Sequence, residues 1–132
     1  MGGPATFQVA MTGSDREREL ARILDAQGYA VIRAPSSGSA TTRALPDLFF
    51  AKNGEKTAVE LKYTGQDRAY YTQEEVVALQ EFAAAFNAYT RLVARYKQDT
   101  TWYSIDPRNA GRTEQGNYVV HRGLDELEQI NE

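Results

Sequence analysis

Asp47, Glu60 and Lys62 have the residue types and the spacing needed to cleave a phosphodiester bond. Two neighbouring carboxylates offer the hard oxygen ligands that a divalent cation prefers, and an adjacent ammonium can contact a phosphate oxygen bound to that cation. The alternative interpretation is a solvated sheet face on which Lys62 and Lys56 neutralise the two acids. That is the commoner situation for an isolated triplet of this kind.

A β-hairpin would bring the two carboxylates together. Asn53-Gly54 separates two strand-like runs, residues 45–52 and 55–63, and is a strong signal for a two-residue turn. In this register Asp47 lies opposite Glu60, with Cβ atoms about 4.5 to 5.5 Å apart, and like charges placed this way are destabilising. Lys62 falls on the same face, which is therefore predicted not to be core. The opposite face is apolar and carries Leu48, Phe50, Val59 and Leu61.

A helix upstream of the hairpin offers a third carboxylate. Ser14 to Glu17 has the pattern of a capping box, and Leu20 and Leu24 follow at helical spacing before a terminating Gly28. Glu17 already has a structural role as the acidic member of that box. It also lies on the stripe that continues to Leu20 and Leu24, so it faces the sheet and could reach a metal ion there.

The remaining elements predict one α/β domain, residues 13–132, preceded by a flexible arm at residues 1–12. Thr72 to Glu75 is a second capping box that begins a helix. Further strands are expected at residues 29–33, 89–97, 101–105 and 118–120. Residues 35–42 are expected to form a mobile loop and residues 107–117 another loop, and Leu124, Leu127 and Ile130 mark a last short helix. This order predicts a mixed sheet of about five strands with helices packed on it.

Composition excludes several classes of protein. The chain has no Cys, which rules out a disulfide scaffold and Cys-ligated metals. It also lacks a signal peptide pattern and an apolar run approaching the roughly 20 residues that span a bilayer, so we expect a cytoplasmic protein. The net charge is −3, but five acids and one base lie from Glu114 onward, and 11 of the 15 bases are Arg. Because Arg makes forked contacts to phosphate, a nucleic-acid partner stays open.

These residues together resemble the archaeal Holliday junction resolvases, which are nucleases of the PD-(D/E)xK superfamily. The likeness covers about residues 13 to 130. It is carried by Glu17-Arg18-Glu19-Leu20, Gly28 to Pro35, Ser37-Gly38-Ser39, Leu45-Pro46-Asp47-Leu48, Glu60-Leu61-Lys62 and Arg112 to Val119. The resemblance implies a restriction-endonuclease-like fold, a homodimer with one metal site per subunit, and symmetric cleavage of four-way DNA junctions in recombination and repair.

The resemblance also implies roles for individual residues. Asp47 and Glu60 would hold Mg²⁺, or Mn²⁺ in its place, with help from Glu17. Lys62 would orient the attacking water or steady the charge on phosphorus, and Ser37 would assist cleavage. The residues expected to contact DNA are Arg18, Arg33, Ser37, Ser39, Arg43, Lys62 and Arg68.

Other functions are kept as alternatives. One is another PD-(D/E)xK nuclease, acting on flaps or cutting duplex DNA like a restriction enzyme, and another is a junction-binding protein without activity. No residue identifies a further partner such as a sliding clamp. The acidic, Arg-rich composition suits a protein that works at high salt, which suggests a halophilic archaeal or viral source.

Several aromatic residues have simpler interpretations. Tyr70 and Tyr71 could stack on bases at a junction centre, although packing is favoured. Phe82, Phe86 and Trp102 are expected in the core or at a dimer interface. His121, the only His, is not expected to act as a ligand.

Overall fold

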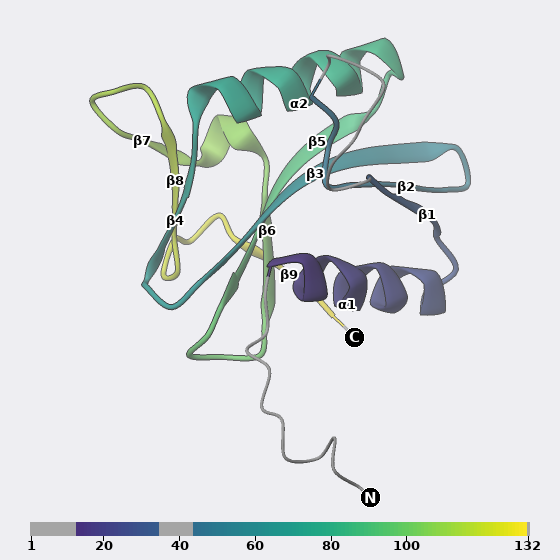
Figure 1. Ribbon diagram of the computed structural model, residues 1–132, viewed down its shortest axis with the longest axis horizontal. Helices are drawn as coiled ribbons and strands as arrows, with labels where there is room; N and C mark the ends of the chain where they lie inside the picture. The colour runs from purple at the N-terminus through teal and green to yellow at the C-terminus, as the bar shows by residue number, and fades with distance from the viewer. Residues whose placement is uncertain (1–12, 35–43, 132) are drawn as a thin grey trace, which may run out of the picture.

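Two helices enclose a twisted, mixed β-sheet in the computed structural model, which describes residues 13–34 and 44–131 (Figure 1). The helices are α1 (Gly13–Ala26) and α2 (Gln73–Ala85), and a 3₁₀ turn covers Pro107–Asn109. The strands are β1 (Ala30–Arg33), β2 (Leu48–Lys52), β3 (Glu55–Thr64), β4 (Arg68–Tyr71), β5 (Tyr89–Tyr96), β6 (Trp102–Ile105), β7 (Gly111–Arg112), β8 (Tyr118–His121) and β9 (Glu128–Ile130). The predicted mixed α/β class is confirmed.

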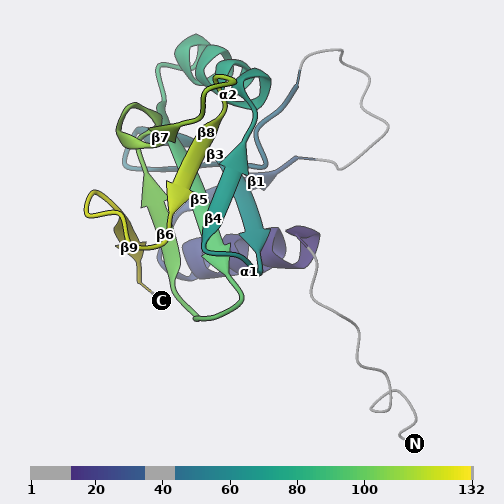
Figure 2. The same ribbon diagram turned by 90° about the vertical axis from the view of Figure 1, so that its left-hand side faces the viewer.

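The strands form two sheets among the described residues. The larger sheet has six strands in the order β1-β2-β3-β5-β6-β9, and only the β3–β5 pair is parallel. The smaller sheet has the order β4-β8-β7 and stands beside the larger one (Figure 2). The prediction of one sheet of about five strands was therefore too simple. It missed β4, which follows the ten-residue strand β3 after only a short turn. It missed β7 because two residues carry too little periodicity to detect.

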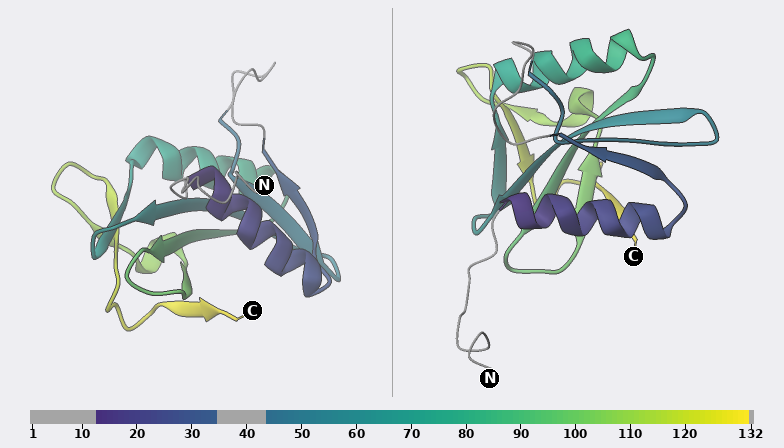
Figure 3. Two further views of the ribbon diagram at one scale, coloured as in Figure 1. Left: turned by 60° about the horizontal axis from the view of Figure 1, so that its bottom comes forward. Right: turned by 45° about the vertical axis from the view of Figure 1, so that its right-hand side comes forward.

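The hairpin of β2 and β3 has the predicted register. Lys52 pairs with Glu55 and Leu48 pairs with Val59. Asn53 and Gly54 both have positive φ, 54° and 84°, as a type I′ turn requires. Asp47 directly precedes β2, so the turn fixes its position relative to β3. The hairpin projects at one side of the molecule (Figure 3).

Helix α1 covers the apolar face of the hairpin. Leu20 and Leu24 are buried against Val59 and Leu61, together with Trp102 from β6. The side chains of α1 that follow at spacings of three and four therefore face the sheet, as the sequence predicts. Trp102 is a core residue and not part of an exposed interface.

Helix α2 covers the opposite face of the sheet, the one that carries Glu60 and Lys62. Val76, Leu79 and Ala83 are buried there against Ala58 and neighbouring core residues. The prediction that this face is not core was wrong for its central part. Ala58 is small and apolar, so the helix packs over it, whereas Glu60 and Lys62 further along β3 stay partly accessible.

The predicted capping box at the start of α2 is confirmed. The Thr72 hydroxyl accepts a hydrogen bond from Glu75 N–H at 3.0 Å, and Glu75 Oε1 accepts one from Thr72 N–H at 2.8 Å. The turn between β7 and β8 supports the same helix end. There the side-chain oxygen of Asn117 accepts a hydrogen bond from Gln73 N–H at 3.1 Å. The first turn of α2 is thus held from two directions.

The C-terminal segment differs from its prediction. In place of a helix marked by Leu124, Leu127 and Ile130, turns lead into β9, which pairs antiparallel with β6. Leu124 and Leu127 pack on the core under α2, whereas Ile130 packs on the core under α1. Spacing by three suggested one helical face, but the open edge of β6 offered backbone hydrogen bonds that outweigh this weak local preference.

The structure modifies two further predictions and leaves two untested. Ser14 lies inside α1, so the first capping box does not begin at that residue. Part of the predicted loop at 107–117 is ordered as the 3₁₀ turn and β7. The N-terminal arm at 1–12 and the loop at 35–42 lie outside the described residues. Within the described ranges, no helix combines the length and apolarity needed to cross a membrane.

Replacing Thr72 by Ala should destabilise the protein by about 1 kcal/mol, because the helix loses the acceptor for Glu75 N–H. The free energy of unfolding in urea measures this loss. Thr72→Ser keeps the hydroxyl and should stay close to wild type. Equal stability of the Ala and Ser variants would show that the cap contributes nothing.

Candidate active site

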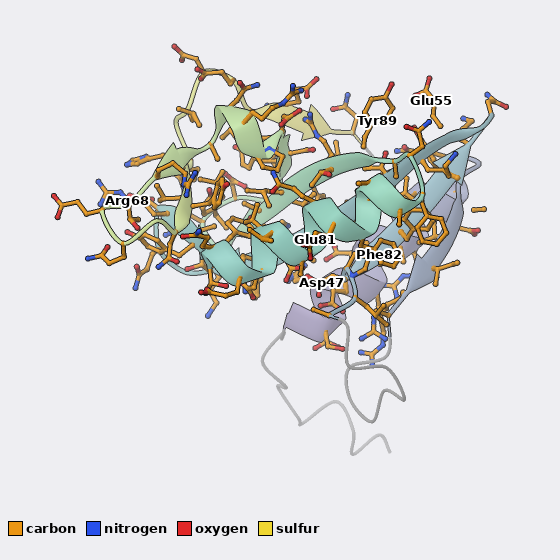
Figure 4. All side chains as sticks on the ribbon, turned by 90° about the horizontal axis from the view of Figure 1, so that it is seen from above. Asp47, Glu55, Arg68, Glu81, Phe82 and Tyr89 are labelled. Carbon is orange, nitrogen blue, oxygen red and sulfur yellow. The ribbon has the colours of Figure 1, made fainter. Side chains whose placement is uncertain are left out.

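Backbone hydrogen bonds hold Asp47 in place at the start of β2. Its N–H donates to the carbonyl of Val59 at 2.9 Å, and its own carbonyl accepts from Ala34 N–H at 3.2 Å. The carboxylate accepts a further hydrogen bond from Leu61 N–H at 2.7 Å. Asp47 therefore has a fixed orientation toward β3, on the side facing α2 (Figure 4).

Glu60 and Asp47 lie beside each other, as the hairpin register predicts, and their side chains share a hydrogen bond. Burial, followed by the negative charges of Asp47 and Glu75, raises the pKa of Glu60 to about 8. Burial also raises the pKa of Asp47, although Leu61 N–H and the Lys62 ammonium oppose the shift. The pair thus shares a proton at neutral pH unless another positive charge is present.

Lys62 donates to a carboxylate that the sequence did not place here. Its ammonium lies 2.8 Å from Glu75 Oε2, on the first turn of α2. Lys56 points elsewhere and contacts the carbonyl of Gly54 near the hairpin turn. The alternative in which Lys62 and Lys56 together neutralise the two acids is therefore not what the structure has.

Glu17 approaches the same group from α1. Its carboxylate lies 3.3 Å from Arg33 Nε at the end of β1. Burial and the charge of Asp47 raise the pKa of Glu17, whereas Arg33 and Arg18 lower it. Glu17 is therefore within electrostatic reach of Asp47, and Arg33 lies between α1 and the hairpin.

A divalent cation fits this arrangement. Mg²⁺ binds proteins through one or two carboxylates and keeps the rest of its shell for water and substrate phosphate. Asp47 and Glu60 provide two such ligands, and burial raises the pKa of both although the Lys62 ammonium opposes the shift. Within the described residues, no group of three or more His, Cys, Asp or Glu side chains is arranged to hold a metal. Direct ligation by Glu17 stays a prediction.

The other predicted DNA contacts are spread over the molecule. Arg18 is exposed on α1 and pairs with Asp15 at 3.2 Å. Arg68 is exposed at the start of β4 and lies well apart from Asp47 (Figure 4). Ser37, Ser39 and Arg43 lie outside the described residues, so their roles stay predictions.

The two neighbouring tyrosines have different environments. Tyr71 is buried, and its hydroxyl donates to the carbonyl of Val93 at 2.5 Å. Tyr70 is half exposed on the outer face of the small sheet. The packing interpretation is thus confirmed for Tyr71 alone. His121 is exposed and pairs with Arg68 across the β4–β8 ladder, away from the carboxylates.

Comparison with known proteins gives the family of this chain. The sequence profile of the archaeal Holliday junction resolvases (Hjc) matches residues 8–131. The chain belongs to this family. The resemblance drawn from the motifs is therefore confirmed.

Individual relatives agree with this assignment. The crossover junction endodeoxyribonuclease Hjc of Sulfolobus acidocaldarius is 36% identical over 109 residues, which are 82% of this chain and 75% of that protein. The crossover junction endodeoxyribonuclease Hje of Saccharolobus islandicus is 30% identical over 100 residues, 74% of this chain and 73% of its own. The crystal structure of Archaeoglobus fulgidus Hjc, a Holliday junction resolvase, superposes with a TM-score of 0.73 at 25% identity, covering 82% of this chain and 87% of that one.

Sequence reasoning missed Glu75 at this candidate site. The residue was assigned only a capping role, which it does perform. One signal was present: Glu75 follows Lys62 by 13 residues and lies on α2, the helix that packs on the charged face of β3. Spacing along the chain could not show which turn of the helix would meet the lysine.

The shared proton of the carboxylate pair gives the metal-free resolvase a pH-dependent stability. Glu60 has a pKa of about 8 when folded and 4.5 in the reference state, so between these values the folded protein binds more protons than the unfolded chain. Rising pH therefore lowers the free energy of unfolding, by at most about 1.4 kcal/mol per pH unit. Urea titrations in EDTA should show this decline, and Glu60→Gln should flatten it.

The exposed Glu55 on the same hairpin serves as the control. Glu55→Gln should keep the wild-type slope. A Glu60→Gln variant with the same pH dependence as wild type would contradict the shared-proton description.

Proposed function

We propose that this chain is a metal-dependent endonuclease that resolves four-way DNA junctions by paired, symmetric nicks, with Mg²⁺ as the cofactor and Mn²⁺ as a substitute. The observation that carries the proposal is the partly buried Asp47–Glu60 pair beside the Lys62 ammonium, in a chain of the resolvase family. A divalent cation would relieve the repulsion between the two ionised carboxylates, and the neighbouring ammonium can bind a phosphate oxygen.

Asp47 and Glu60 would hold the metal, which lowers the pKa of a bound water and offsets charge on the phosphate. The Leu61 N–H fixes the orientation of the Asp47 carboxylate, and Glu60 must release its proton to become a ligand. The Lys62 ammonium lies on the same face and can contact the scissile phosphate as negative charge develops on it. Glu17 would help Asp47 and Glu60 to hold the metal from the α1 side of the site.

DNA contacts are proposed for basic and hydroxyl side chains around this centre. Arg33 precedes Ala34, whose N–H donates to the Asp47 carbonyl, and its guanidinium is oriented by Glu17 and Ser14. It can therefore receive a phosphate beside the cleaved bond. Arg18 lies on the same end of α1. The remaining proposed contacts are Ser37, Ser39, Arg43, Lys62 and Arg68.

A homodimer is proposed through an apolar face that joins α2 to the hairpin. Phe49, Phe82 and Phe86 form an aromatic cluster with ring centroids 4.9 to 5.5 Å apart. Ile32 pairs with Phe49 across β1 and β2 and therefore extends this face. Ile32 is 66% exposed and Phe86 is 47% exposed. Such a continuous apolar surface is typical of an interface, and two opposed cuts require two sites related by symmetry.

Replacing Phe86 by Asp should convert the dimer to a monomer, because a charge would be buried at the interface. Sedimentation velocity measures the mass of the species in solution. Tyr89, which is exposed and lies apart from Phe82 (Figure 4), gives the control Tyr89→Asp, which should stay dimeric. A wild-type chain that sediments as a monomer would contradict the proposed interface.

Cleavage of a synthetic four-way junction beside linear duplex of the same arms tests the activity, from low to molar salt. Wild type with Mg²⁺ should nick opposite strands of the junction and leave the duplex intact. EDTA or Asp47→Asn should lower the rate more than about 100-fold, because the bound metal would lower the activation free energy by several kcal/mol. Glu55→Gln should cleave like wild type.

Two outcomes would contradict the proposal. Cutting of the linear duplex at the rate of the junction would indicate a nuclease of another substrate class. Binding of the junction without cleavage at any salt concentration would indicate a binding protein.

A further inference from the structure

We propose that Glu75 is a positioning residue for the cleavage reaction, which holds the Lys62 ammonium at the edge of the metal site and away from Asp47 and Glu60. This inference rests on the proposed nuclease function. It concerns a residue on α2, outside the motif formed by Asp47, Glu60 and Lys62.

Both oxygens of Glu75 are engaged, each by a different partner. Oε1 accepts the hydrogen bond from Thr72 N–H at 2.8 Å, and Oε2 lies 2.8 Å from the Lys62 nitrogen. The backbone contact prevents the carboxylate from rotating to follow the lysine. Glu75 is therefore a fixed acceptor, whereas Lys62 is a flexible side chain with several rotatable bonds.

The support of Glu75 extends into the small sheet. Asn117, in the turn between β7 and β8, accepts a hydrogen bond from Gln73 N–H, and the backbone of Gly116 comes close to the Gln73 side chain. A Cβ atom at Gly116 would lie 2.4 Å from Gln73 Oε1, and its φ is +90°. This turn thus docks directly on the helix end that carries Glu75.

Without Glu75 the nearest acceptors for Lys62 are the carboxylates on its own face of the hairpin. Asp47 and Glu60 both interact electrostatically with Lys62. An ammonium bound to their oxygens would compete with a divalent cation for the same lone pairs. By binding the Lys62 ammonium itself, Glu75 leaves those oxygens available and keeps the ammonium directed at the substrate phosphate.

The Glu75→Gln variant tests this role, with Glu74→Gln as its matched control. Gln can still accept from Thr72 N–H, because capping boxes contain either Glu or Gln, so the helix end is preserved. The variant removes the negative charge that faces Lys62, and with it the weaker effect of that charge on Asp47 and Glu60. Glu74 is exposed on the same turn, and its replacement removes an identical charge from the helix N-terminus.

Two measurements are made on each full-length protein. Junction cleavage should show kcat lowered about 10- to 100-fold in Glu75→Gln with little change in KM, as for a residue that orients another catalytic group. In metal-free protein, NMR of the lysine ammonium groups should show a protected Lys62 signal in wild type and Glu74→Gln. That signal should be lost in Glu75→Gln. The chain has only four lysines, so Lys→Arg variants assign the signals.

The outcomes separate this inference from the proposed function. A wild type that never cleaves junctions overturns the proposed function, and the ammonium spectrum then still decides whether Glu75 holds Lys62. A Glu75→Gln variant that cleaves like wild type, or that retains the protected Lys62 signal, overturns the inference alone. An equal loss of kcat in Glu74→Gln also overturns it, because the effect would then come from general helix charge.

Discussion

The repulsion between Asp47 and Glu60 is the constraint around which the site is organised. The hairpin register forces the two carboxylates together, and partial burial makes their charges more expensive than in water. A protein that only needed to fold would gain by replacing one of them. Leu61 N–H and Lys62 offset part of this cost, and the cation proposed for the site would offset the remainder. Under the proposed function, the protein gives up stability at this position to bind the metal.

The two helices contribute to this pair from opposite faces of the sheet. Leu20 and Leu24 anchor α1 on one face, which brings Glu17 to the side of Asp47. Val76 and Leu79 anchor α2 on the other, which brings Glu75 to Lys62. The apolar cores therefore do more than stabilise the fold. Each core sets the position of one charged side chain at the open end of the β2–β3 hairpin, opposite its turn.

Membership of the resolvase family fits a site that reads little sequence. The residues proposed to meet DNA are Arg, Ser and Lys around a carboxylate centre, which are groups that contact phosphate more than base edges. Specificity for a four-way junction then depends on the spacing between two such sites. The aromatic face of Phe49, Phe82 and Phe86 begins on the helix that carries Glu75, so a dimer formed there would fix that spacing through the same element.

The sequence by itself determined the hairpin, both helices and the pairing of Asp47 with Glu60, because each depends on contacts between residues close in the chain. Asn53-Gly54 dictates one register, and a capping box is satisfied within four residues. The tertiary structure alone decided the C-terminal strand, the separate β4-β8-β7 sheet and the position of Glu75. Ile130 joins a strand because β6 had an open edge, and Glu75 meets Lys62 because α2 packs on Ala58. These outcomes depend on surfaces made by distant segments, which no local pattern encodes.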